Sequence, residues 1–156
     1  MTLGGIMDTY EKAVIAGLLA NVGDVLMHLI GFLSLKTTMT GHYIASLIFF
    51  GRNITPLRFL IGEIAHFVAG GLTGILLWLL FKYFGDKRPY LKSIGLLMGM
   101  WILHVVVIPN IINRPRPIVV RSEMEAIVDL ISHLVYGVIA VAIFRKTKLI
   151  STVPAK

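Results

Sequence analysis

Four histidines and three carboxylates stand inside long apolar runs of the sequence, with one histidine in each run. Three of these histidines lie three or four residues from a carboxylate, which places the two side chains one turn apart on the same face of a helix. Ionisable side chains are costly inside a bilayer and mark a functional site by default. The seven residues are Asp24, His28, Glu63, His66, His104, Asp129 and His133.

Imidazole and carboxylate groups together form the mixed nitrogen and oxygen shell that suits iron, zinc, manganese or copper. Seven donors exceed what a single zinc ion needs. Either two metals would fit, or one metal whose histidine ligands are hydrogen-bonded to the carboxylates. Glu63-Ile-Ala-His66 resembles the Glu-x-x-His pattern of ferritin-like di-iron four-helix bundles in its choice of ligands. We therefore predict that all seven residues are metal ligands or their direct partners, with Glu63 the best candidate for a bridging or terminal carboxylate.

Three other interpretations use the same residues. Two of the histidines could ligate haem b, although the carboxylates would then have no evident role. The polar layer could instead belong to a transporter or channel for a metal ion or protons. It could also be purely structural, in a small subunit of a membrane complex. If the centre is catalytic, a lipid-like or small substrate is the natural expectation at this depth.

The composition explains why these residues must be read as intramembrane groups. The chain has 156 residues, of which 56% are hydrophobic and 15% are charged, and its mean hydropathy is +0.84. Soluble domains are nearer a quarter charged, so this composition indicates a membrane protein of one domain. The absence of cysteine excludes disulfides and thiolate ligands.

Four runs are long enough to cross a hydrocarbon layer of about 30 Å. They cover residues of about 13–35, 56–84, 91–112 and 122–144. A further apolar run at 41–50 is too short to cross and predicts an interfacial or re-entrant helix between the first two spans. The predicted fold is an all-α integral membrane protein, a single four-transmembrane-helix bundle.

Local signals mark where these helices begin and end. Thr55 before Pro56 predicts an N-cap, and Ser122 with Glu125 predicts a capping box. Pro109 is expected to end or kink the regular part of the third span. Asp8 and Glu11 precede the first run, which favours a retained anchor over a cleaved signal peptide.

Lysine and arginine counts predict the orientation. One side of the membrane would hold nine basic residues and the other side six, so both termini are expected in the cytoplasm and the protein in the inner cell membrane. At 1.5 Å per residue, all seven ionisable residues then lie roughly 8–16 Å from the outer ends of their spans. They would form one layer in the outer half of the bundle.

The remaining features concern partners. Gly70 with Gly74, and Gly95 with Gly99, form small-xxx-small patterns that could pack helices within the chain or between copies in a homo-oligomer. Five arginines near the outer side could contact headgroups or hold an anionic lipid or ligand. They are Arg52, Arg58, Arg114, Arg116 and Arg121. The basic residues lie next to the membrane spans, so nucleic-acid binding is not expected and the lipid bilayer is the expected partner.

Overall fold

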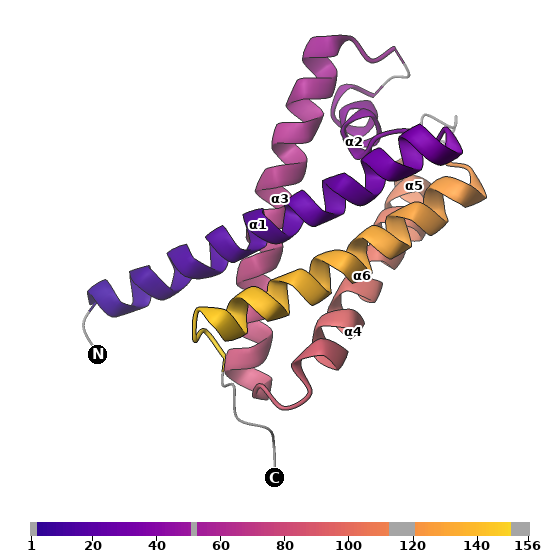
Figure 1. The fold of residues 1–156 in the computed structure, drawn as a ribbon. Coiled ribbons are helices and arrows are strands. Elements are labelled where there is room, and N and C mark those ends of the chain that lie inside the picture. Colours follow the sequence, from indigo (N-terminus) through magenta and orange to yellow (C-terminus); the bar gives the residue numbers. More distant parts are fainter. Residues whose placement is uncertain (1–2, 51–52, 113–120, 151–156) are drawn as a thin grey trace.

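The computed structural model describes residues 3–50, 53–112 and 121–150, and it contains helices and connecting turns without any strand in these ranges (Figure 1). The elements in chain order are α1 (Leu3–Leu35), α2 (Thr40–Phe49), α3 (Pro56–Phe84), α4 (Pro89–Ile102), the π-helix η1 (Leu103–Val107), α5 (Ile108–Ile112) and α6 (Glu123–Lys146). Four spans are long and apolar enough to cross a membrane, and the third of them combines α4, η1 and most of α5. The predicted all-α four-span fold is confirmed.

The predicted boundaries hold to within a few residues, except at the start of α1. That helix begins at Leu3 rather than near residue 13. Hydropathy marks only the part of a helix that fits the hydrocarbon layer, whereas residues such as Glu11 and Lys12 are good helix formers and remain exposed here. The polar start of α1 therefore continues the same helix beyond the apolar run.

Both predicted N-caps are present. The Thr55 side chain accepts a hydrogen bond from the Arg58 amide at 3.3 Å, and Pro56 takes the first helical position. Ser122 and Glu125 form the reciprocal capping box. Glu125 also accepts from the amide of Thr38 at 3.1 Å, so this cap ties the start of α6 to the segment after α1.

Glycines allow α1 and α3 to cross in close contact. The two helices cross each other while α6 runs beside α1 (Figure 1). A Cβ atom on Gly17 would lie 2.5 Å from the carbonyl oxygen of Gly70, and one on Gly74 would lie 2.3 Å from that of Ala13. The Gly70/Gly74 face is therefore used within the chain. Gly95 and Gly99 have open space around them, and oligomerisation through their face stays a prediction.

The half of the bundle where α3 and α6 end is an apolar core. It is built around fully buried Leu77, Leu97 and Phe144, with small alanines of α1 packed against them. The third span takes little part in the core: 6% of its most apolar stretch is buried, against 39–44% for the other three spans. It packs on α6 and has little contact with α3.

The π-helix η1 ends at Val107, two residues before Pro109, the proline that was predicted to end or kink the regular part of the third span. A proline has no N–H, so Pro109 leaves a backbone carbonyl one turn earlier without its helical donor. The Tyr43 hydroxyl of α2 donates to the carbonyl of His104 at 2.7 Å. Burial raises the pKa of the Tyr43 phenol, which keeps this donor protonated. The irregular segment is thereby fixed to α2.

Candidate functional site: a histidine–carboxylate chain on a cavity

The seven predicted site residues come together in a connected cluster. Its first part joins α3 to α1 through His66. The Nε2 atom of His66 lies 3.0 Å from Asp24 Oδ2, and its Nδ1 atom lies 3.7 Å from Glu63 Oε2. The other Glu63 oxygen accepts from the amide of Gly41 in α2 at 3.0 Å. One imidazole therefore has a carboxylate beside each of its two nitrogens.

The second part of the cluster joins α1 to α6 through His28, which is 2% exposed. Its Nε2 atom lies 3.7 Å from Asp24 Oδ2, 3.4 Å from Asp129 Oδ1 and 3.0 Å from Ser132 Oγ. Ser132 donates its own proton to the carbonyl of Asp129, so its oxygen accepts from His28. This arrangement matches a His28 ring that carries a proton on Nε2.

Asp129 ends the chain of contacts against a fixed positive charge. Its Oδ2 atom accepts from the Arg121 guanidinium at 3.1 Å, and both side chains are buried by 90% or more. His133 donates from Nδ1 to the Asp129 carbonyl at 2.8 Å. The rings of His133 and His104 stand edge to face with centroids 5.4 Å apart, which brings the histidine of η1 into the same cluster.

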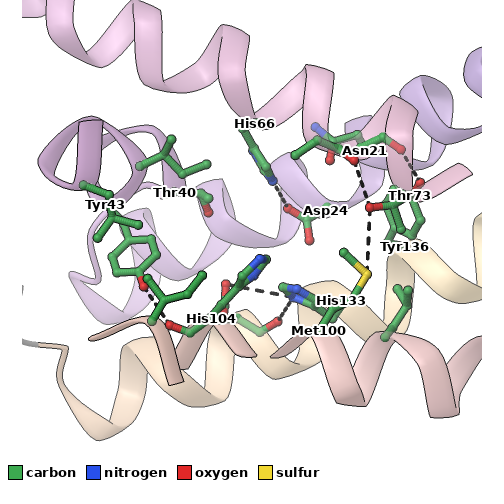
Figure 2. A pocket seen from close by; sticks show the side chains of 17 residues that line it. Asn21, Asp24, Thr40, Tyr43, His66, Thr73, Met100, His104, His133 and Tyr136 are labelled. Carbon is green, nitrogen blue, oxygen red and sulfur yellow. Dashed lines mark hydrogen bonds and ion pairs between the residues drawn. The ribbon is translucent and has the colours of Figure 1, made fainter. Parts of the chain in front are cut away.

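Five residues of this cluster line a cavity of about 150 Å³ between α1, α2, α3, the third span and α6, namely Asp24, His66, His104, Asp129 and His133. Figure 2 shows His66 and Asp24 pointing toward each other on one side, with His104 and His133 on the other. Ile44, Leu47 and other aliphatic side chains supply the apolar part of the lining. The cavity therefore combines acid–base groups with an apolar wall.

Several buried polar atoms of the lining residues have no hydrogen-bond partner among the described residues. They are Asn21 Nδ2, Asp24 Oδ2, Thr40 Oγ1 and His66 Nδ1. His66 lies within ion-pair distance of Asp24 and Glu63, but the angles of these contacts are not those of a hydrogen bond. Buried polar groups are almost always satisfied, and such a group calls for an ion, a water or a ligand beside it. The lining thus offers a polar occupant one amide donor, one carboxylate acceptor, and a hydroxyl and an imidazole nitrogen that can each donate or accept.

A hydrogen bond between α6 and α3 borders the end of the cavity that faces the apolar core. The Tyr136 hydroxyl donates to the carbonyl of Gly70 at 2.6 Å, and Thr73 donates to the carbonyl of Ala69 at 2.8 Å. Beyond them lies the apolar core around Leu77 and Phe144. In the described part of the chain, the polar cluster occupies one half of the bundle and does not continue through it.

The fit to a metal ion is incomplete. The donor types are suitable, and Asp24 Oδ2 lies between the Nε2 atoms of two histidines. Within residues 3–50, 53–112 and 121–150, however, no three histidine, aspartate or glutamate side chains already converge as a metal-holding group. A bound metal would require some of these side chains to turn from the positions described above.

Sequence reasoning missed the role of two residues. Arg121 was grouped with the outer arginines, yet it turns inward onto Asp129 and stacks over the Tyr43 ring at 4.4 Å. Ser132 was overlooked, although it stands one turn from Asp129, on the face that meets His28. Its place on that face was the available signal.

The other outer arginines differ in how they lie. Arg58 donates to the carbonyl of Asn53 and lies over the Phe49 ring, with the centroid 5.0 Å away. Arg52, Arg114 and Arg116 lie outside the described residues. An anionic lipid or ligand at this end stays a prediction.

Comparisons with models of protein families, with curated proteins and with solved structures give no match for this chain. Its function must therefore be inferred from the site itself.

Proposed function

We propose that this protein is an integral membrane protein whose cavity binds a small polar ligand or ion and exchanges protons with it through the histidine–carboxylate chain. One observation carries the proposal: His66 stands on the cavity wall with a carboxylate beside each ring nitrogen, at 3.0 and 3.7 Å. Histidine is the side chain whose ordinary pKa suits proton exchange near neutral pH. An imidazole so placed can take a proton at one nitrogen and release one at the other.

The order of the contacts defines the route. Glu63 is the most exposed of the three carboxylates, with 16% of its side chain accessible, so it is the natural point of exchange with the outside. A proton passes from the Glu63 carboxyl to Nδ1 of His66, and the imidazolium releases its Nε2 proton to Asp24. The neighbouring Arg121 holds Asp129 as a fixed carboxylate at the far end. The half of the bundle around Leu77 and Phe144 is apolar. The described chain therefore supports an exchange site better than a continuous proton channel.

Infrared difference spectroscopy tests this route directly. On acidification of the detergent-purified protein from about pH 8 to about pH 5, we expect carboxylic acid and imidazole bands to change together, because the two kinds of group share protons. Asp24→Asn should remove the coupled change. Glu123→Gln is the matched control, since Glu123 is an exposed carboxylate at the start of α6 and lies outside the cavity lining. A wild-type spectrum that Asp24→Asn leaves unaltered would contradict the proposal.

A transition-metal centre is the second candidate, and the position of Asp24 favours it. Its buried Oδ2 atom lies 3.0 Å from His66 Nε2 and 3.7 Å from His28 Nε2 and accepts no hydrogen bond from the described residues. Asp24, His28 and His66 would hold an iron, zinc, manganese or copper ion, with Glu63, His104, Asp129 and His133 as further ligands or as partners of the imidazoles. The metal would supply Lewis-acid or redox chemistry inside the cavity.

Elemental analysis with an absorption spectrum separates the two candidates. A metal centre requires a stoichiometric amount of one of these metals, retained in His42→Ala and lost in His66→Ala. His42 is a suitable control because it packs on Phe59 and does not line the cavity. A Soret band would instead indicate haem b. Absence of metal after reconstitution with each ion would reject the metal centre and leave proton exchange or a structural role.

A further inference from the structure

The helices α3 and α6 both end at the opposite end of the bundle (Figure 1). A second cavity lies between these ends. Its volume is about 780 Å³, within the range of pockets that hold small ligands. Four basic side chains and a single carboxylate line it. The basic residues are Lys82, Arg145, Lys146 and Lys148, and the carboxylate is Asp86. The lining therefore carries an excess of positive charge.

The floor of this cavity is apolar. Trp78, Phe81 and Ile150 are 4–8% exposed and belong to the hydrophobic core. Ile150 reaches this position because the chain reverses after α6: Lys148 has a left-handed backbone with φ of 58°, and the Leu149 amide donates to the Phe144 carbonyl at 2.9 Å. The same turn leaves the Lys148 side chain exposed on the rim. Charge on the rim and aromatic surface below it give the cavity an amphipathic lining.

Aromatic rings orient two of the cations without neutralising them. The Lys82 ammonium lies 4.8 Å from the centroid of the Trp78 ring, and the Arg145 guanidinium lies 5.0 Å from that of Tyr90. Arg145 Nε is buried and has no hydrogen-bond partner in the described part of the chain. Asp86 is the one carboxylate among the described lining residues and can offset only one of the four cations, so the lining keeps positive charge for an anion.

We infer that this cavity binds the phosphate group of an anionic phospholipid. Lys82, Arg145, Lys146 and Lys148 would surround the phosphate, and the glycerol and first acyl carbons would lie against Trp78, Phe81 and Ile150. Basic pockets between transmembrane helices bind such headgroups on the cytoplasmic side, which is the side that the lysine and arginine counts predict for this end. The site is separate from the histidine–carboxylate cavity and does not depend on its function.

Native mass spectrometry of protein released from mixed nanodiscs tests the inference. We expect phosphatidylglycerol to be retained in preference to phosphatidylcholine. Lys82→Gln/Lys148→Gln should lower that retention at least about tenfold, because each basic residue near the surface contributes substantially to the attraction. Both side chains are exposed, so the substitutions leave the core intact. Lys87→Gln/Arg88→Gln is the control, with the same loss of charge at the same end but outside the cavity.

Three results would overturn the inference. Equal retention of the two lipids would show that the cavity has no preference for an anionic headgroup. An equal loss in the cavity variant and in the control would show that general surface charge attracts the lipid. Displacement of phosphatidylglycerol by millimolar inorganic phosphate would assign the cavity to a free anion instead of a lipid.

Discussion

Replacing Arg121 by Gln should lower the free energy of unfolding by about 3 kcal/mol, because it leaves the buried Asp129 carboxylate without its cation. Asp129 is 3% exposed, and its Oδ2 atom lies 3.1 Å from the guanidinium. Removing one partner of a buried pair costs more than replacing both, since the remaining charge stays desolvated. Denaturant titration of the detergent-purified protein measures the change.

The double variant Arg121→Gln/Asp129→Asn gives the decisive comparison. With both charges removed, most of the lost stability should return, and the two substitutions should be strongly non-additive. Arg58→Gln is the matched control at the same end, because Arg58 bonds a backbone carbonyl and should change stability by less than about 1 kcal/mol. If Arg121→Gln were as mild as the control, Arg121 would not compensate Asp129.

Replacing Gly74 by Ala should destabilise the bundle by about 1–3 kcal/mol, as overpacking does in a tightly packed interior. The added methyl group would lie 2.3 Å from the carbonyl oxygen of Ala13 and 2.8 Å from the Cα atom of Gly17. Both are backbone atoms, so α1 and α3 must move apart. The movement would also separate Asp24 on α1 from His66 on α3, which are in contact at 3.0 Å.

The third span supplies the control for this substitution. Gly99→Ala adds the same methyl group where no described atom outside the adjoining helix backbone lies within 4 Å, and alanine is the better helix former. We expect Gly99→Ala to be neutral or slightly stabilising in the monomer when thermal unfolding is measured. If the two variants unfolded at the same temperature, the α1–α3 crossing would not depend on close contact at Gly74.

Much of the fold was predictable because it depends on local properties of the chain. Hydropathy over some 20 residues identifies a span without reference to its neighbours. The caps at Thr55 and Ser122 depend on residues three positions apart. The start of α1 was the exception, because helix propensity continues where hydropathy ends.

The sequence predicted which residues lie close together in the candidate site, but only some of the contacts between them. Depth along each helix follows from residue counting, so Asp24, Glu63 and Asp129 could be placed in one layer with the histidines. The rotation of each helix about its axis is set by packing, such as the contact of Gly17 with Gly70. That rotation determines that His66 meets Asp24 of α1 as well as Glu63 on its own helix.

By itself the sequence determined the four spans, their caps and the common depth of the seven ionisable residues, since hydropathy, capping and helical rise act within one helix. Only the tertiary structure decided that Arg121 faces Asp129, that Tyr43 bonds the carbonyl freed before Pro109, and that the four basic residues surround a second cavity. These contacts join residues on different elements or across a chain reversal. Their distances depend on how the helices cross, which no local pattern along the chain specifies.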